Sequence, residues 1–407
     1  MAAPLAHLRV LDLSRVLAGP WAAQFLADMG AEVIKVERPG EGDDTRGWGP
    51  PFAREPSEGD PGLSAYYLCA NRGKKSVTID MASKEGQELI RKLAAKSDVL
   101  IENFKVGGLA KYGLDYASIK VINTGIVYCS VTGFGQTGPY APRAGYDFLV
   151  QGMGGLMSVT GEPDSVQGGG PVKVGVAISD QIAGMNALAG ILAALVRRER
   201  TGEGDHIDVG LLDATVSSLI NQASTHLVAG TVPGRMGNAH PTVVPYQAFA
   251  TAKGYIILAI GNDGQFARFC KAAGLDHLPG DAKFTTNAGR IVNRGELIPQ
   301  IIAAMKAKTA EQWIALFEPL AVPCGPINNI DQVFENPQVK ARQMRRVLEH
   351  PLAGPLPVVG NPVRMTSHDT TAQKAPPLLG EDTDAVLRGV LGMEDAEVRG
   401  LRERGIV

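Results

Sequence analysis

The sequence has almost no net charge. Its 40 lysines and arginines are balanced by 42 aspartates and glutamates, which leaves a formal net charge of -2. Proteins that bind nucleic acid concentrate Lys and Arg on one face. We therefore expect no nucleic-acid partner.

Cysteine is also scarce. The chain has neither a Cys-x-x-Cys pair nor a histidine at the spacing of a metal site, and its four cysteines are Cys69, Cys129, Cys270 and Cys324. Such a pattern supports neither a disulfide framework nor a zinc centre. We predict buried thiols in a reducing compartment and no bound metal.

Signals for secretion or for a membrane are missing from the sequence as well. The first ten residues contain no charged region followed by an apolar stretch, and we find no apolar run of about 18 residues. We expect a cytoplasmic protein without a membrane partner. With 44% hydrophobic residues, the chain has enough apolar side chains for two or three domains.

The N-terminal half alternates strand-like and helix-like segments. Strands are predicted at residues 8–13 and 32–37, with a helix over 18–29 between them. The same alternation continues with predicted strands at 76–79, 99–101 and 126–131 and predicted helices at 84–96 and 184–200. This order indicates an α/β fold with a parallel sheet covered on both faces.

The character of the sequence changes near residue 225, where glycine-rich turns begin. A predicted strand at 254–260 and helices at 263–273 and 296–308 indicate a second unit. The last residues, 382–407, have the apolar spacing of helices that pack back on the first unit. The parts that we predict are a large domain from 1–225, a smaller domain from 226–325 and a returning C-terminal part from 326–407.

The first turn between strand and helix lacks a nucleotide fingerprint. A dinucleotide-binding unit needs G-x-G-x-x-G there, but residues 14–20 contain one glycine and one proline. This disfavours a nicotinamide-dependent dehydrogenase. Arg38 follows the acidic end of the second strand, where it is placed either to bind a ribose phosphate, such as the 3'-phosphate of coenzyme A, or to lie solvated on the surface.

Ten segments in this order resemble the class III CoA transferases, the family that includes formyl-CoA transferase and carnitine CoA transferase. They cover nearly the whole chain and lie at residues 18–21, 30–40, 42–46, 71–76, 102–104, 144–147, 154–161, 174–180, 201–204 and 376–380. The resemblance implies a Rossmann-like large domain built from both chain ends, an inserted smaller α+β domain and an interlocked homodimer. The partners it implies are an acyl-CoA and a small carboxylic acid.

By this resemblance the catalytic nucleophile is Asp180. It is expected between a strand over 174–178 and a long helix, where the helix dipole would lower its carboxyl pKa, although the same position suits a simple N-cap. Asp180 would attack the acyl-CoA, pass through a mixed anhydride and then carry CoA as a thioester. Backbone amides beside it, such as that of Gln181, are candidate oxyanion donors. Coenzyme A is then substrate and product, and no permanently bound cofactor is implied.

The resemblance also implies binding residues. Tyr146 and Asp147 would line the active site near the thioester, and a loop with Gly237, Asn238 and His240 would cover the intermediate. The nucleotide part of coenzyme A would contact Leu17, Ala18, Arg38, Ile79, Asp80, Met81, Ala82, Asn103, Phe104, Lys105 and Lys111. Leu17 and Ala82 replace a glutamine and a lysine of formyl-CoA transferase, and the loop replaces a run of glycines.

The substrates implied are dicarboxylates. Residues 244–249 and 322–329, together with Arg143, resemble the branch that acts on succinate, glutarate and hydroxymethylglutarate, so succinyl-CoA is the expected donor. A distal carboxylate in a partly buried site needs a cation, for which guanidinium is the best match. Arg46, Arg143 and Arg235 are candidates that the sequence does not rank.

Two other functions stay open. Racemases of α-methylacyl-CoA are similar in fold but have histidine at the position of Tyr146, and tyrosine, with a pKa near 10, is a poor base at neutral pH. A non-catalytic acyl-CoA-binding protein has no need for a reactive carboxylate at Asp180.

Overall fold

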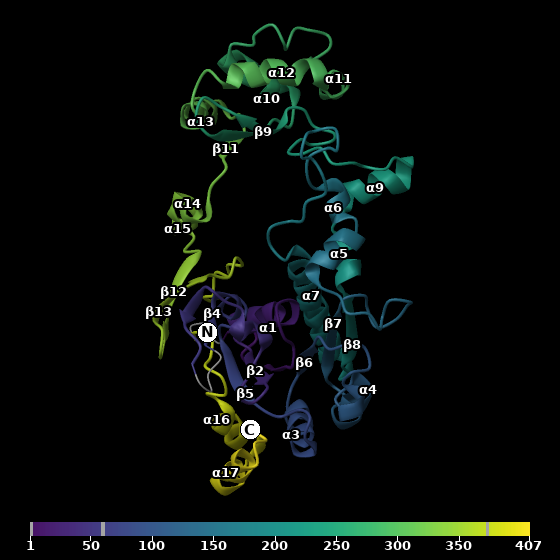
Figure 1. Cartoon of the computed structure of the whole chain (residues 1–407), viewed down its shortest axis with the longest axis vertical. Helices are drawn as coiled ribbons and strands as arrows, with labels where there is room; N and C mark the ends of the chain where they lie inside the picture. The colour runs from purple at the N-terminus through teal and green to yellow at the C-terminus, as the bar shows by residue number, and fades with distance from the viewer. Residues whose placement is uncertain (1–2, 58–61, 372–373) are drawn as a thin grey trace. The chain divides into compact units, whose positions relative to one another are not determined.

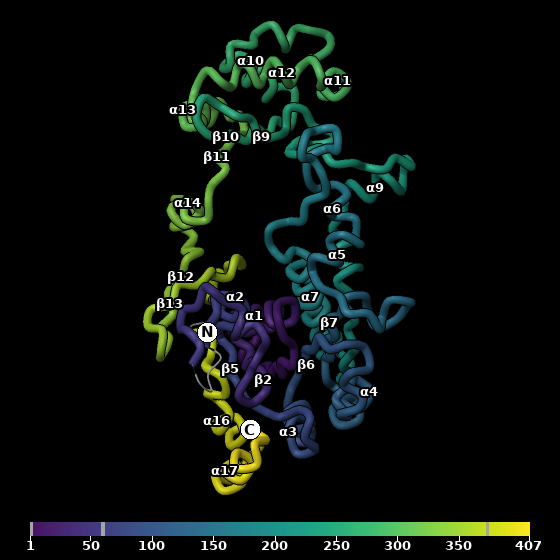
Figure 2. Tube along the Cα trace, in the orientation of Figure 1, coloured from purple at the N-terminus to yellow at the C-terminus, as the bar shows by residue number. Residues whose placement is uncertain are grey.

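The computed structural model describes residues 3–57, 62–371 and 374–407, and the chain divides into two compact units. Unit 1 comprises Met1–Leu156, Val174–Ser224 and Pro337–Val407, and unit 2 comprises Met157–Lys173 and Thr225–Asn336. Both chain ends therefore belong to unit 1, as the purple and yellow parts of the tube in Figure 2 show. Unit 2 includes two segments that the sequence analysis had placed in the other parts, 157–173 and 326–336.

A six-stranded parallel sheet forms the centre of unit 1 (Figure 1). In spatial order its strands are β5 (Lys74–Thr78), β2 (Glu32–Glu37), β1 (Arg9–Asp12), β6 (Val99–Glu102), β7 (Val127–Thr132) and β8 (Asp205–Gly210). Five of these were predicted within a few residues, and β8 was missed. The strand order reverses between β1 and β6, and open α/β sheets bind their ligands at the carboxyl ends of the strands at such a point.

Helices cover both faces of the sheet, and its central strands are therefore buried on both sides. Helices α1 (Ala18–Asp28) and α7 (Ile178–Thr201) share a core with Val10 and Ile101. On the other face, α3 (Lys84–Ala94) and the C-terminal helices α16 (Thr383–Leu391) and α17 (Asp395–Glu403) share a core with Leu11 and Leu100. The C-terminal segment thus packs on the first sheet, where the carbonyl of Ile406 accepts the amide of Asp80 at 2.8 Å.

Helix α7 has a length and composition that would allow it to cross a membrane. The sequence has no continuous apolar run of about 18 residues, and α7 passes this test only by its length and mean hydropathy. One face of α7 buries Ala183, Ala187 and Ile191 in the core shared with α1 and the sheet. This packing is that of a core helix in an α/β unit.

The other elements of unit 1 are β3 (Phe52–Arg54), β4 (Leu63–Ser64), α2 (Ala65–Leu68), α4 (Tyr116–Ile122), α5 (Asp147–Met153), α8 (Leu211–Ser217), α15 (Pro337–Ala341), β12 (Arg345–His350) and β13 (Gly354–Val359). Two helices span the chain positions at which the units meet, α6 (Leu156–Val159) and α9 (Ile220–Ala229). Of the cysteines, Cys69 is exposed, so the prediction of buried thiols is wrong there.

Unit 2 has its own core around a three-stranded antiparallel sheet. Its elements are β9 (Tyr246–Ala250), β10 (Tyr255–Ala259), β11 (Cys324–Pro326), α10 (Asp263–Ala273), α11 (Asn287–Val292), α12 (Arg294–Met305), α13 (Ala310–Phe317) and α14 (Ile330–Glu335). The predicted strand and both predicted helices of this region are present. Trp313 and Phe317 stack in the core, and the Trp313 indole donates to the carbonyl of Met305 at 2.8 Å.

Candidate functional site

Asp180 lies in the first turn of α7, which begins at Ile178. The strand predicted for residues 174–178 is absent, because this stretch is irregular until the helix starts. The amide of Val174 donates to the side-chain oxygen of Gln151 at 2.8 Å instead of entering a sheet. Val176 is 60% exposed, so the alternating branched side chains of this stretch do not form a buried strand.

Asp147 holds the start of α7. One of its carboxylate oxygens accepts the backbone amide of Ser179 at 2.8 Å, and the other accepts the side-chain amide of Gln151 at 2.8 Å. The hydroxyl of Ser179 in turn accepts from Thr215 at 2.9 Å. These bonds fix the residue immediately before Asp180, so Asp147 helps to position Asp180.

The environment of Asp180 raises its carboxyl pKa to about 7. Burial is the larger cause and the charge of Asp147 adds to it, while a hydrogen bond from the amide of Ala18 acts in the opposite direction. The expectation of a lowered pKa is therefore wrong, because burial and the charge of Asp147 outweigh the hydrogen bond from Ala18. A strongly perturbed carboxyl group in a cavity is typical of a functional site.

The amide that reaches Asp180 comes from the N-terminus of α1. Ala18 is the first residue of that helix, and amides of a first helical turn have no partner within the helix. The amide of Gln181 is instead bonded to the carbonyl of Ala177 at 3.1 Å, so it does not serve as the predicted oxyanion donor. The next residue, Gly19, packs closely, since a Cβ there would lie 2.4 Å from the side chain of Ser14.

Asp180 lines a cavity of about 650 Å³. Six other residues that the resemblance assigns to the site line the same cavity: Ala18, Asn103, Phe104, Lys105, Lys111 and Tyr146. Asp147 does not line this cavity but accepts a hydrogen bond from the amide of Ser179, the residue before Asp180. The structure thus brings the predicted nucleophile together with a large part of the predicted binding residues.

A second cavity, of about 290 Å³, lies at the carboxyl ends of β1 and β2. Its lining contains the remaining predicted nucleotide contacts except Leu17: Arg38, Ile79, Asp80, Met81 and Ala82. Phe104 and Arg15 line both cavities, so the two adjoin. Arg38 is exposed and forms an ion pair with Glu41 at 2.8 Å. Together the cavities provide room for one long ligand that extends to Asp180.

The loops after β1 and β6 are tied together where the strand order reverses. The side chain of Asn103 accepts the amide of Arg15 at 2.9 Å and donates to its carbonyl at 2.6 Å. This side chain is therefore occupied in joining the two loops. Asn103 contributes to the site chiefly by holding Phe104 and Arg15 between the cavities.

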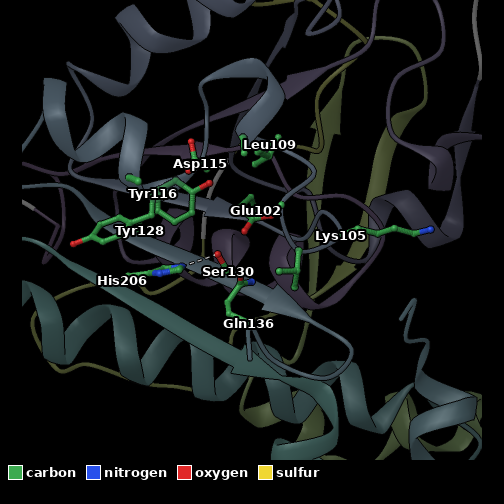
Figure 3. A pocket seen from close by; sticks show the side chains of 13 residues that line it. Glu102, Lys105, Leu109, Asp115, Tyr116, Tyr128, Ser130, Gln136 and His206 are labelled. Atoms are coloured by element: carbon green, nitrogen blue, oxygen red, sulfur yellow. Dashed lines mark hydrogen bonds between the residues drawn. The ribbon is translucent and has the colours of Figure 1, made fainter. Parts of the chain in front are cut away.

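Glu102, which the sequence analysis did not assign, supports the same turn from behind. Its buried carboxylate accepts the amide of Phe104 at 2.7 Å. Figure 3 shows Glu102 between Tyr116 and Lys105 in a separate cavity, with the hydroxyl of Ser130 bonded to His206 at 2.9 Å nearby. Burial raises the pKa of Glu102 to about 7. An acidic residue at the end of a buried strand was the available signal.

Tyr66 was also missed. Burial and then the charge of Asp180 raise the pKa of its phenol to about 12, so the hydroxyl stays protonated close to Asp180. Its ring lies 5.1 Å from that of Trp48, which lines the Asp180 cavity. Nothing in the local sequence distinguishes Tyr66 from its neighbour Tyr67.

Other predicted residues are not brought into these cavities. Leu17 lines a third, largely apolar cavity with Trp21. Gly237, Asn238 and His240 belong to unit 2, where the amide of Gly237 donates to the carbonyl of Gly161 at 3.0 Å. Gly237 has φ +58°, a left-handed conformation that suits glycine.

A parallel sheet with two adjoining cavities at its reversal point, one of them lined by a carboxylate whose pKa is raised, is typical of an α/β enzyme for a nucleotide-containing substrate. Comparison with known proteins gives its family. The profile of CoA-transferase family III matches residues 5–383. The chain belongs to CoA-transferase family III, and the predicted family is confirmed.

The relatives cover nearly the entire chain. It is 49% identical to a succinate–glutarate CoA-transferase of Agrobacterium fabrum, over 94% of this chain and 95% of the relative. It is 43% identical to the human succinyl-CoA:glutarate CoA-transferase, over 99% of this chain and 90% of the relative. The crystal structure of a CAIB/BAIF family protein from Brucella suis matches with a TM-score of 0.85 at 46% identity, covering 96% of this chain and 100% of that one.

Proposed function

We propose that this CoA transferase moves CoA from succinyl-CoA to a second dicarboxylate such as glutarate. The observation that carries the proposal is the partly buried carboxylate of Asp180, which has a raised pKa and lines the 650 Å³ cavity together with the predicted CoA contacts. The names of the relatives at 43% and 49% identity support this pair of acids.

Coenzyme A occupies both cavities in this proposal. Its nucleotide end lies against Arg38 and residues 79–82, and its pantetheine arm passes Phe104 toward Asp180. A phosphate beside Arg38 would compete with the exposed carboxylate of Glu41 for the guanidinium. Lys105 and Lys111 supply further positive charge along the same path.

The reaction begins when ionised Asp180 attacks the thioester carbonyl of succinyl-CoA. The CoA thiolate leaves, and a mixed anhydride of succinate and Asp180 forms. The thiolate then attacks the aspartyl carbonyl, which releases succinate and leaves CoA bound to Asp180 as a thioester. The amide of Ala18, which donates to the carboxylate at rest, is placed to stabilise the oxyanion of these steps.

The second half reverses this order with the new acid. The acceptor carboxylate attacks the aspartyl thioester, so that the thiolate leaves and a second anhydride forms. The thiolate attacks the acceptor's acyl carbon, giving the new acyl-CoA and restoring the Asp180 carboxylate. One CoA has moved between two acids, and no water is consumed, so the site must exclude water while the anhydride exists. We assign this cover to the loop with Gly237, Asn238 and His240.

The proposal includes a homodimer. The face of α7 opposite its buried side exposes Met185, Leu192 and Val196, which are 53%, 36% and 54% accessible in the single chain. Exposed apolar stripes of this kind are typical of association surfaces. We propose a second copy of the chain as the partner, interlocked as the family resemblance implies.

A matrix of donors and acceptors tests the function. The protein is mixed with succinyl-CoA and with glutarate, oxalate or pentanoate in turn, and the products are followed by mass spectrometry. We expect glutaryl-CoA and succinate in equal amounts, with Asp180→Ala inactive. Release of free CoA without a new acyl-CoA would indicate a hydrolase, and no consumption of succinyl-CoA would indicate a binding protein.

A further inference from the structure

The three arginines that were candidates for a distal carboxylate differ in their partners. Arg46 is buried, and its guanidinium binds both carboxylate oxygens of Glu37 at 2.7 Å and the hydroxyl of Tyr67 at 2.6 Å. A buried bidentate pair of this kind is already neutralised. Arg46 therefore holds the fold and is not free for a substrate.

Arg235 is also engaged. Its guanidinium forms an ion pair with Asp164 and donates to the carbonyl of Glu162 at 3.1 Å, all within unit 2. Binding a substrate carboxylate there would require displacement of Asp164.

Arg143 lines the same cavity as Asp180. Its guanidinium lies over the rings of Tyr140 and Phe134, at 4.6 and 5.3 Å from their centroids. No carboxylate in the described parts of the chain forms an ion pair with Arg143. The aromatic rings orient the guanidinium plane and leave its N–H groups available.

A close backbone contact holds the loop that carries Arg143. Gly133 follows β7, and a Cβ on it would lie 2.4 Å from the Cα of Gly145. Only glycines allow this approach, which fixes the loop at the carboxyl end of β7. Two residues further, Asp147 binds the amide of Ser179 beside the nucleophile. Four residues span at most about 14 Å, so Arg143 is tethered near Asp180.

The other cations of this cavity have different surroundings. Arg15 pairs with Asp44 at 3.0 Å, and the ammonium of Lys111 lies 4.6 Å from the ring centroid of Tyr112. Lys105 also lines the separate cavity of Glu102. These three lie with the loops proposed to hold the nucleotide arm, whereas Arg143 precedes Tyr146 on the acyl side.

We infer that Arg143 binds the distal carboxylate of the acyl group and thereby selects dicarboxylates over monocarboxylates of the same length. The inference rests on the proposed function, since it takes Asp180 as the residue that meets the thioester. A guanidinium binds a carboxylate through two parallel hydrogen bonds, and a free carboxylate in this cavity needs such a partner. Arg143 serves donor and acceptor in turn, because the two acids occupy the same position.

The test compares Arg143→Gln with Arg15→Gln, which removes another guanidinium from the same cavity. Each protein is assayed with succinyl-CoA plus glutarate and with butyryl-CoA plus pentanoate, acids that lack the distal carboxylate. We expect Arg143→Gln to lower kcat/KM for the dicarboxylate pair roughly 10- to 100-fold, as for one charge-assisted contact, and to change the other pair less than about threefold. Arg143→Lys keeps the positive charge but not the two parallel N–H groups of a guanidinium, so its kcat/KM for the dicarboxylate pair should lie between those of the wild type and of Arg143→Gln. Arg15→Gln should change kcat/KM for both pairs by the same factor.

Binding supplies a second measurement that needs no turnover. In the Asp180→Asn protein, adding Arg143→Gln should weaken the binding of succinyl-CoA and leave the binding of butyryl-CoA unchanged. Equal losses for both ligands, or none for either, would overturn the assignment of Arg143. A wild-type protein that makes no glutaryl-CoA would instead contradict the proposed function, so the two failures are distinguishable.

Discussion

Asp147 and Asp180 are two carboxylates in one active site with different surroundings. Asp147 accepts hydrogen bonds from Ser179 and Gln151, whereas Asp180 lines the cavity and accepts from the amide of Ala18. The difference supports the roles that we propose for them, with Asp147 as the positioning group and Asp180 as the group that reacts. It also couples them, because the charge of Asp147 helps to raise the pKa of Asp180.

The pH dependence of transfer tests this coupling. Burial, and then the charge of Asp147, raise the pKa of Asp180 to about 7, and only the ionised carboxylate attacks. The rate should therefore rise with pH through about 7. Asp147→Asn removes the neighbouring charge but keeps an oxygen for the Ser179 amide, so the midpoint should move to lower pH.

The measurement is kcat/KM for succinyl-CoA across the neutral range. Asp44→Asn is the matched control, because Asp44 also lines the cavity but is paired with Arg15. Its midpoint should stay where the wild-type midpoint is. An unchanged midpoint in Asp147→Asn would show that the charge does not act on Asp180.

At this scale the sequence led to the proposed reactive residue, but it did not give the protonation properties of that residue. Asp180 was recognised from the segment around it, yet its pKa was predicted in the wrong direction, because desolvation depends on what covers the residue. Arg46 and Arg143 were equivalent in the sequence. They became distinct only when the fold placed Glu37 beside one and an open cavity beside the other.

At the scale of elements, the loops after β1 and β6 lie between the two cavities. The turn after β6 is tied to the loop after β1 by Asn103 and is supported from behind by Glu102. Phe104 lies in this turn and lines both cavities. Its position should therefore control how coenzyme A passes from one cavity to the other.

Substitutions at Glu102 test the support. Glu102→Ala removes the acceptor of the Phe104 amide. Loss of one such hydrogen bond corresponds to roughly a 3- to 10-fold change in affinity. We expect that increase in KM for succinyl-CoA, with kcat changed less. Glu102→Gln keeps an acceptor oxygen and should retain the wild-type KM. If both variants raise KM equally, the hydrogen bond is not what holds the turn.

Periodicity predicted most elements of the sheet and failed where burial differed from the pattern. Val174 and Val176 have the alternation of a strand, but Val176 is exposed and the segment leads irregularly into α7. Strand β8 was missed because half of its residues are polar at the edge of the sheet. In both cases the deciding fact was the presence or absence of a neighbouring strand.

At the scale of the whole molecule, one helix would connect the proposed catalysis to the proposed association. Helix α7 carries Asp180 in its first turn, packs one face on the sheet and exposes an apolar stripe on the other. Composition did not reveal this stripe, because its residues are separated by other residues in the sequence and come together only on one face of the helix. The interlocking of two chains is predicted by the family resemblance alone.

A charge on this stripe should weaken the dimer. Leu192→Asp places a carboxylate among Met185 and Val196, where burial against a second chain would leave it unpaired. In sedimentation equilibrium we expect the wild-type protein at twice the chain mass and this variant shifted toward the single chain. Val121→Asp, at a position outside α7 that is 81% exposed, is the control and should not change the mass. A wild-type monomer would contradict the proposal.

The covalent intermediate on Asp180 is the central claim, and intact-protein mass spectrometry tests it most directly. Protein mixed with succinyl-CoA alone should gain the mass of CoA minus water, on the peptide that contains Asp180. Hydroxylamine should remove the adduct, glutarate should discharge it as glutaryl-CoA, and Asp180→Asn should not form it. Repeated absence of the adduct, under conditions where transfer to glutarate is demonstrably fast, would contradict the covalent route and the role of Asp180.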